Sequence, residues 1–588
     1  MRASHQFKAI LALLSTLICQ FAFAQTEDDR PNFLLIMVDD MGYTDIGAYG
    51  SEINTPVLDQ LAKEGLLMTD FHNQAVCRPT RSALMGGTDS HNAGGGMHQA
   101  VNQRDEPGYE SVLNDNTIAF PSLLQAAGYN TYFTGKWHLG NDAGNRPSGR
   151  GFDRSFALLP GMASHYHDAS FVQASRKSAY SEDGVDVEKL PEDFYSTTFY
   201  TDYIIDAIEK DRETGAPWFT YLAYTAPHWP LQAPPEYIAK YEGMYDEGYD
   251  VLREKRIEAS KAAGIFPADA KTYPQLDIVE PWDTLSDEEK KVAVREMEIY
   301  AAMVDFLDES IGRLVDYLKS IDEYENTVIV FLTDNGAEGQ IRNPGGGGDG
   351  GFDTSYENMG KINSYVHYRT GWAEAAGSVM RYFKSFSSEG GIRGQAIFHY
   401  PKSGVSGVKS DQLTSVIDIA ATFVDMANAP HPQDLADGKP VHPLQGKSLR
   451  PLIMGETDIV RTDDDILAWE VFGHLAVRKG DWKLLQLATK SSDSGQRPAQ
   501  EAGFWGLYDM ATDPGETTDL SDQNPEVVEE LLAAWDQYSA NHGLIIPIVD
   551  DTSGAGGGGA AMGGGMGGGM GGGMGGEMGG EMAGGNGN

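Results

Sequence analysis

From about Pro31 to Ala429 the chain alternates short apolar runs with amphipathic stretches. Four runs are almost continuously hydrophobic: Asn32–Val38, Asn130–Thr134, Trp218–Tyr224 and Thr327–Leu332. Strands that are apolar on both faces are typical of a parallel sheet covered by helices on each side. The pattern therefore predicts the α/β fold class, with a mostly parallel mixed sheet sandwiched by helices in a large domain.

Later segments predict long helices and a second, smaller unit. Residues 241–321 are charged and helix-prone, and Ser286 followed by Glu289 predicts a capping box. Apolar runs at 475–487 and 504–510 predict strands, and 524–543 predicts a terminal helix that ends at Gly543. We therefore expect a large domain over residues 25–430, and a C-terminal subdomain with an antiparallel sheet and a helix over residues 431–550.

The two ends of the chain differ from the rest in composition. Arg2 and Lys8 accompany a short apolar run, and Ala22-Phe23-Ala24 fits a cleavage site, so residues 1–24 predict a signal peptide. Residues 551–588 consist mainly of Gly and Met, cannot build a packed core and predict a disordered tail. We expect an exported protein, periplasmic or secreted.

The charge of the chain limits its possible binding partners, and its cysteine content raises the question of what Cys77 does. The chain has 86 acidic and 44 basic residues and a formal charge of −42, which argues against nucleic acid or an anionic membrane as a partner. Beyond the first 24 residues, Cys77 is the only cysteine. An unpaired cysteine in an exported protein is either reactive, modified, or buried and inert.

Polar side chains of an unusual kind follow each of the four predicted strands. Ligands of open α/β sheets bind beyond the carboxyl ends of the strands, so parallel neighbours would bring these side chains to one edge. Singly, each set could be a turn or a helix cap. Together they offer oxygen ligands suited to Ca²⁺ or Mg²⁺, and cationic groups for an anionic ester. The oxygen ligands are Asp39, Asp40, Asp334 and Asn335, and the cationic groups are Lys136, His138 and His228.

The segment around Cys77 predicts a helix that begins at or just after this residue. Pro79 suits the first turn of a helix, and the dipole of that helix together with Arg81 would favour an anion or a thiolate at position 77. This pattern alone suggests an activated cysteine nucleophile. A metal site built from hard oxygen ligands is, however, a poor partner for a free thiolate.

The segment CRPTRSALMGG (77–87) resembles the C-x-P-[ST]-R-x-x-L-x-x-G signature of the type I sulfatases, members of the alkaline-phosphatase-like superfamily. GYNTYFTGKWHLG (128–140) is similar to the second sulfatase signature. The likeness covers nearly all of the chain after the predicted signal peptide. Residues 249–269 and 364–376 look most like the bacterial arylsulfatases of the Pseudomonas type. Residues 25–430 would then be the sulfatase catalytic domain.

The resemblance implies a mechanism and a role for each site residue. A maturation enzyme would oxidise Cys77 to Cα-formylglycine, whose hydrated aldehyde is the nucleophile that attacks a sulfate ester. Calcium, in preference to magnesium, would be held by position 77 together with Asp39, Asp40, Asp334 and Asn335. Asp334 would also help to deprotonate the geminal diol.

The same resemblance assigns the remaining groups. Arg81 would fix the aldehyde hydrate and the metal ligands. Lys136 and Lys384 would bind sulfate oxygens, and Lys384 with His228 would ease departure of the alcohol or phenol. His138 would take the proton from the remaining hydroxyl, so that sulfate is eliminated. Aryl sulfates are the expected working substrates.

Two other functions are compatible with the same residues. A phosphonate or phosphodiester hydrolase of the same superfamily would share most of this site, although the segments similar to arylsulfatases favour sulfate esters. A catalytically silent relative that binds a sulfated glycan would keep Cys77 as a thiol.

Overall fold

The computed structural model describes residues 29–97, 106–170, 174–340, 350–488 and 503–545. The predicted signal peptide (1–24) and the predicted Gly/Met tail (551–588) lie outside these residues. Within the described segments, no helix is both long enough and apolar enough to cross a membrane.

Four central strands of the main sheet coincide with the four apolar runs. They are β8 (Thr327–Thr333), β1 (Asn32–Val38), β7 (Trp218–Ala223) and β3 (Asn130–Lys136), adjacent in that order. Each neighbouring pair is parallel. Val38 is level with Thr333, and Met37 and Gly135 are both level with Ala223. The carboxyl ends of these strands therefore meet at one edge, as the sequence predicts.

Further strands on both sides make the sheet mixed. β9 (Arg393–His399) runs antiparallel to β8 and to β2 (Leu66–His72), and β4 (Arg154–Leu158) is parallel to β3. In the described residues the sheet has 11 strands. Its outer members are β10 (Val408–Ser410), β11 (Thr414–Ser415), β5 (Tyr180–Glu182) and β6 (Val185–Asp186).

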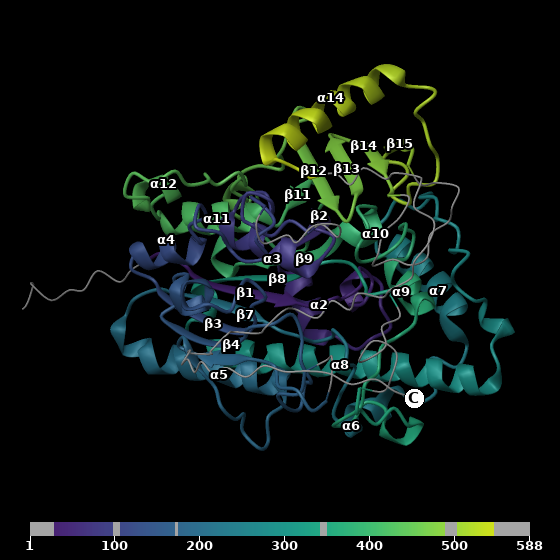
Figure 1. Ribbon diagram of the computed structural model, residues 1–588, viewed down its shortest axis with the longest axis horizontal. Coiled ribbons are helices and arrows are strands. Elements are labelled where there is room, and N and C mark those ends of the chain that lie inside the picture. Colours follow the sequence, from purple (N-terminus) through teal and green to yellow (C-terminus); the bar gives the residue numbers. More distant parts are fainter. Residues whose placement is uncertain (1–28, 98–105, 171–173, 341–349, 489–502, 546–588) are drawn as a thin grey trace, which may run out of the picture. The chain divides into compact units, whose positions relative to one another are not determined.

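Helices cover both faces of this sheet, because each strand presents apolar side chains in both directions. Along β1, Leu34 and Ile36 belong to one hydrophobic cluster, and Phe33 and Leu35 belong to another. Figure 1 shows α5 and α8 beside one face, and α4 and α11 beside the other. The helices are α2 (Pro56–Glu64), α3 (Cys77–Gly86), α4 (Phe120–Ala126), α5 (Ser196–Asp211), α6 (Pro235–Ile238), α7 (Gly248–Ala262), α8 (Asp287–Ser320), α9 (Thr370–Gly377), α10 (Glu389–Ile392), α11 (Ile417–Ala427), α12 (Pro432–Leu435), α13 (Arg450–Ile453) and α14 (Pro525–His542).

Helix α8 begins at the predicted capping box. The Ser286 hydroxyl accepts a hydrogen bond from the Glu289 N–H, and the Glu289 carboxylate accepts one from the Ser286 N–H at 2.9 Å. This reciprocal pair satisfies backbone donors that the first turn of a helix otherwise leaves free. The helix continues to Ser320 without a break.

The C-terminal part of the chain forms a second, antiparallel sheet. Its strands are β12 (Ile466–Val471), β13 (His474–Lys479), β14 (Trp482–Gln486) and β15 (Trp505–Asp509). Helix α14 packs on this sheet through Leu531 and Trp535, which share a hydrophobic cluster with Val477. Figure 1 shows α14 lying across the four strands. The predicted antiparallel sheet and terminal helix are thus present, and the helix ends before Gly543, which has a φ of 61°.

Buried polar contacts join the second sheet to the main one. The Trp469 indole N–H on β12 donates to the Asn73 carbonyl oxygen at 2.8 Å. The Lys483 ammonium on β14 lies 2.7 Å from the Glu389 carboxylate and 2.6 Å from the Glu516 carboxylate. Because Asn73 lies just before Cys77 in the sequence, the second sheet contacts the segment that leads to this cysteine.

Candidate active site

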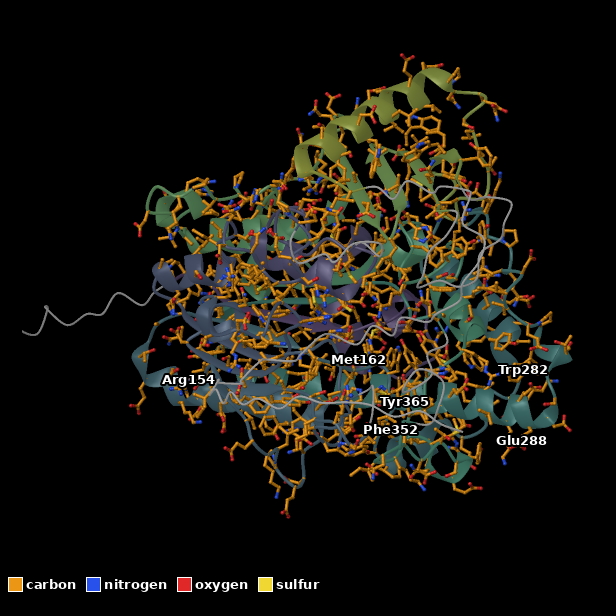
Figure 2. All side chains as sticks on the ribbon, in the orientation of Figure 1. Arg154, Met162, Trp282, Glu288, Phe352 and Tyr365 are labelled. Atoms are coloured by element: carbon orange, nitrogen blue, oxygen red, sulfur yellow. The ribbon has the colours of Figure 1, made fainter. Side chains whose placement is uncertain are left out.

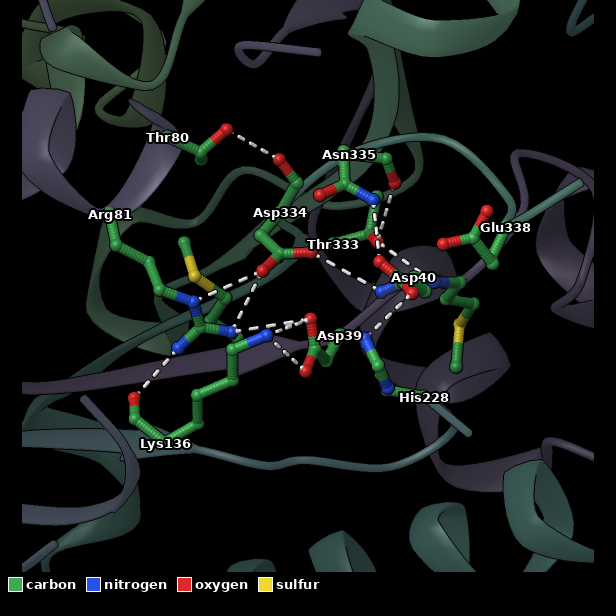
Figure 3. Close-up of polar contacts among 12 residues, drawn as sticks. Asp39, Asp40, Thr80, Arg81, Lys136, His228, Thr333, Asp334, Asn335 and Glu338 are labelled. Carbon is green, nitrogen blue, oxygen red and sulfur yellow. Dashed lines mark hydrogen bonds and ion pairs between the residues drawn. The ribbon is translucent and has the colours of Figure 1, made fainter. Parts of the chain in front are cut away.

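The polar groups predicted after the four strands do meet at one edge of the sheet. Asp39 and Asp40 follow β1, Asp334 follows β8, and Lys136 is the last residue of β3. A strand pleat would point the two consecutive aspartates to opposite faces. Asp40 has a φ of 64°, a conformation that departs from the strand and lets both carboxylates contribute to the same site (Figure 3).

Two buried ion pairs connect these strand ends. The Lys136 ammonium lies 2.8 and 2.7 Å from the two oxygens of Asp39. The Arg81 guanidinium donates to one oxygen of Asp334 through Nε and Nη2, at 3.1 and 2.8 Å, and to the Lys136 carbonyl oxygen at 2.8 Å. Arg81 therefore bridges two strands and helix α3.

Asp40 is the centre of a second group of contacts. Its Oδ2 accepts from the Lys384 ammonium at 2.7 Å and lies 3.3 Å from His228 Nε2, and its Oδ1 accepts from the Asn335 amide at 2.7 Å. Burial alone would raise the pKa of Asp40, but Lys384 and His228 together hold it below its ordinary value. Asp40 is therefore an ionised carboxylate.

Cys77 is the first residue of α3, as predicted, and its side chain is buried. A ligand atom of Cys77 lies within 4.8 Å of one from Asp39 and one from Asp334. Burial raises the pKa of the thiol, although Lys136 and Lys384 oppose this. Burial thus disfavours a thiolate at the unmodified residue, against the pull of the two lysines.

The acidic groups fit a divalent cation. Asn335 directs its amide N–H₂ to Asp40 and to the Gly336 carbonyl oxygen, which leaves its buried Oδ1 without a hydrogen-bond partner. Burial and the charge of Asp334 raise the pKa of Asp39 well above its ordinary value. A cation among these oxygens would satisfy Asn335 and relieve the repulsion between the carboxylates.

His138 is a neutral base beside the first turn of α3. Its Nε2 accepts a hydrogen bond from the Arg78 guanidinium at 3.2 Å, so the proton of the neutral ring is on Nδ1. Burial, together with Arg78 and Lys136, lowers its pKa well below the ordinary value. Arg78 follows Cys77 directly, so this contact places His138 next to the residue that carries the thiol.

His228 has a fixed orientation on the opposite side of Asp40. Its Nδ1 lies 2.5 Å from the Trp229 carbonyl oxygen and therefore donates to it, so Nε2 faces Asp40. Burial lowers the pKa of His228 well below the ordinary value; Asp40 opposes this shift and Lys384 reinforces it. The His165 ring, with Nε2 3.0 Å from the His228 carbonyl oxygen, supports the same turn.

The structure brings the ten predicted residues together at one edge of the sheet, nine of them buried and His138 half-buried, and adds three more. Thr80 Oγ lies 2.6 Å from the Asp334 carbonyl oxygen, Arg78 contacts His138, and Glu338 lies 3.3 Å from Lys384. Thr80 is inside the signature segment, so that segment gave a signal for it. Arg78 occupies a position that the signature leaves open, and Glu338 lies outside the signature, so the sequence pattern gave no signal for either.

The chain is similar to known proteins over most of its length. The sulfatase family profile matches residues 31–429, and a profile for the C-terminal region of N-sulphoglucosamine sulphohydrolase matches residues 377–539. An uncharacterised sulfatase of Schizosaccharomyces pombe is 40% identical over 548 residues, covering 89% of this chain and 95% of that protein. An arylsulfatase of Klebsiella aerogenes is 37% identical over 458 residues, covering 75% of this chain and 96% of that protein.

A solved structure shares the fold. The crystal structure of Ps i-CgsB in complex with k-i-k-neocarrahexaose superimposes with a TM-score of 0.61 and 24% sequence identity, covering 87% of this chain and 93% of that one. The family profile spans more than half of the sequence, and the relatives are similar over most of their length. The chain therefore belongs to the sulfatase family, whose members hydrolyse sulfuric esters.

Proposed function

We propose that this sulfatase acts on aryl sulfates, with a nucleophile made from Cys77 by oxidation to formylglycine and with Ca²⁺ held by Asp39, Asp40, Asp334, Asn335 and position 77. The observation that carries the proposal is the position of Cys77. It begins α3 within 4.8 Å of two carboxylate oxygens, at a buried position that raises the pKa of its own thiol. A buried thiol in this state is a poor nucleophile, so a modified side chain fits the surroundings better.

The formylglycine and the calcium ion would supply complementary chemistry. The hydrated aldehyde would provide a nucleophilic oxygen and the calcium ion would stabilise negative charge on sulfuryl oxygens, which is usually the largest catalytic contribution. Arg81 would orient position 77 through Asp334, since it contacts that carboxylate twice. Lys136 and Lys384 would bind the anionic group, because both ammonium groups are buried beside metal-ligating aspartates.

His138 has the protonation state that a general base needs, and the Lys384 ammonium carries the positive charge that a leaving oxygen needs. His138 is neutral, and its Nε2 lone pair can accept a proton once Arg78 yields its contact. The Lys384 ammonium, which lies at Asp40, would assist the leaving oxygen of the alcohol or phenol. His228 would join it only when its Nε2, which carries no proton in the neutral ring, becomes protonated. Acid and base would thus act on different sides of the reacting group.

Aromatic side chains beside His228 support an aryl substrate. The Trp229 ring lies 4.7 Å from the His228 ring and 5.7 Å from the Tyr365 ring, and Phe352 lies 5.3 Å from Tyr365. Figure 2 labels Tyr365 and Phe352. Aromatic pairs of this kind can accept a further ring by offset or edge contact. The similar chain from Klebsiella aerogenes is named an arylsulfatase.

The maturation enzyme and the export signal complete the proposal. Conversion of Cys77 requires a formylglycine-generating partner, and the signal peptide expected at residues 1–24 would direct the protein to the periplasm or the exterior. Neither nucleic acid nor an anionic membrane is a proposed partner, since the formal charge is −42.

Peptide mass spectrometry across residue 77 tests the proposal, using protein from a host that has the maturation enzyme. We expect a mass in which the thiol sulfur is replaced by an aldehyde oxygen, together with hydrolysis of 4-nitrophenyl sulfate that disappears in Cys77→Ala. An unmodified thiol throughout the sample, or full activity in Cys77→Ala, would contradict the proposed nucleophile. A folded protein that binds sulfated glycan without turnover would favour the silent relative instead.

A further inference from the structure

The Lys384 ammonium lies between two buried carboxylates. It is 2.7 Å from Asp40 Oδ2 and 3.3 Å from Glu338 Oε2, and more than nine-tenths of each of the three side chains is buried. Among the described residues, these two are the only carboxylates within ion-pair distance of the amine. Lys384 thus depends on them for compensation of its charge.

Asp40 and Glu338 differ in their other contacts and in their proposed role at the metal site. Asp40 already accepts from Asn335 and lies 3.3 Å from His228, and it is a proposed metal ligand. A divalent cation bound to Asp40 would draw on the charge of that carboxylate and repel the ammonium at the same time. Glu338 is no proposed ligand, so its charge remains available to Lys384.

Glu338 itself is held in place by its own loop. Its Oε1 accepts a hydrogen bond from the Gln340 N–H at 3.0 Å, which leaves Oε2 directed to Lys384. The same loop contacts the lysine again through the backbone, because the Lys384 N–H donates to the Ala337 carbonyl oxygen at 3.0 Å. The loop that carries Asp334 and Asn335 therefore fixes Lys384 at both its backbone and its amine. Figure 3 shows Glu338 on the Asp40 side of the cluster.

We propose that Glu338 is a positioning residue for the reaction: it keeps the Lys384 ammonium directed at the leaving oxygen of the substrate when Asp40 is bound to the metal. The inference rests on the proposed function, in which Lys384 assists the leaving group. A carboxylate that acts only through Lys384 makes no contact with the substrate. Its loss should therefore matter most for substrates whose leaving group needs assistance.

The test compares two aryl sulfates that differ in leaving group, 4-nitrophenyl sulfate and phenyl sulfate. Nitrophenolate departs without much help, whereas phenolate departs slowly unless a proton or a cation stabilises it. We expect Glu338→Gln to lower kcat/KM for phenyl sulfate by about 10- to 100-fold, as supporting residues of a site commonly do, and to lower it much less for 4-nitrophenyl sulfate. Glu338→Asp should recover part of the loss on phenyl sulfate.

Glu296→Gln is the matched control, because Glu296 is also a buried glutamate paired with a cation, Arg369, at 2.9 Å. It should leave the ratio of the two kcat/KM values unchanged. An equal loss on both substrates in Glu338→Gln, or no loss on either, would overturn the inference. If Glu338→Gln fails to fold, the same two-substrate ratio measured for Glu338→Asp decides in the same way.

The wild-type enzyme separates this inference from the proposal on which it rests. If wild-type protein with converted Cys77 hydrolyses neither ester, the proposed function fails. If it hydrolyses both and the ratio is the same in wild type and Glu338→Gln, only the role of Glu338 fails.

Discussion

The Arg81 guanidinium places two of its N–H groups, from Nε and Nη2, on a single oxygen of Asp334, at 3.1 and 2.8 Å. A third N–H reaches the Lys136 carbonyl oxygen. A lysine ammonium has no planar fork and cannot make this set of bonds. We expect Arg81→Lys to lower kcat by about 100-fold, measured with 4-nitrophenyl sulfate. Circular dichroism should show a folded protein, and near-normal turnover would contradict the orienting role.

Asn335 gives a test of the metal site that does not depend on activity. Removing the amide with Asn335→Ala deletes the buried Oδ1 and the hydrogen bond to Asp40, so calcium affinity should fall by about 10- to 100-fold. Isothermal titration calorimetry measures the affinity, and the midpoint of thermal unfolding should rise with calcium less than in wild type. The exposed residue Asn116 offers a control, since Asn116→Ala should bind calcium normally.

Tyr365 tests the aryl part of the proposal. Tyr365→Ala removes a ring whose centre lies 5.7 Å from the centre of the Trp229 ring. An aromatic pair contributes about 0.5–1.5 kcal/mol in addition to the free energy gained by burying its surface. We expect KM for 4-nitrophenyl sulfate to rise roughly 3- to 10-fold, with a smaller change for a linear alkyl sulfate. Equal changes for the two substrates would indicate a general disturbance of the site and no specific contact with the aryl ring.

The ion pairs of His91 lead us to expect that the folded protein loses stability at alkaline pH. Its ring nitrogens lie 2.9 Å from Asp89 and 3.1 Å from Glu470; burial opposes the charge, but these carboxylates raise the pKa of His91 to about 9. Because the folded pKa exceeds the unfolded value of 6.5, the stabilisation is complete below about 6.5 and is lost as pH rises through about 9.

The size of this effect is on the order of 3 kcal/mol in the free energy of unfolding. Urea denaturation between pH 6 and pH 9.5 measures it, and His91→Gln should flatten the pH dependence over this range. A wild-type protein that is as stable at pH 9.5 as at pH 6.5 would show that His91 is neutral in the folded state.

Lys483 tests the connection between the two sheets. Its ammonium is fully buried between Glu389 and Glu516, so Lys483→Met removes the cation that these two carboxylates share and should destabilise the fold by about 3–5 kcal/mol. Lys479, one strand earlier, pairs with Glu530 at the surface, and Lys479→Met should change stability little. The midpoint of thermal unfolding of each variant measures the difference.

The sequence predicted the central strands and most of the site because both depend on local pattern. Continuous apolar runs mark β1, β3, β7 and β8, and the polar residues that follow them mark the edge where they meet. β9 has no such run, since Arg393–His399 includes a buried glutamine, Gln395, whose amide donates to the Gly42 carbonyl oxygen at 2.6 Å. A polar residue satisfied by a partner about 350 positions away leaves no trace in the local pattern.

Lys384 shows the same limit within the site. It lies in a loop between α9 and α10 and follows no strand, so strand-end reasoning does not reach it. Only the resemblance to the sulfatase family named this lysine. The pairing of Lys384 with Asp40 and Glu338 depends on how two loops meet in space, which hydrophobic periodicity does not encode.

The separation of Asp40 and Lys384 along the chain has a consequence for biosynthesis. Asp40 and Lys384 are 344 positions apart, and Cys77, buried in the folded protein, emerges from the ribosome early. At about 5–20 residues per second, roughly 300 residues after Cys77 take tens of seconds to be made. Until then the segment that carries Lys384 does not exist. If Cys77 is converted as proposed, the order of translation would give the maturation enzyme access to this residue before the finished fold buries it.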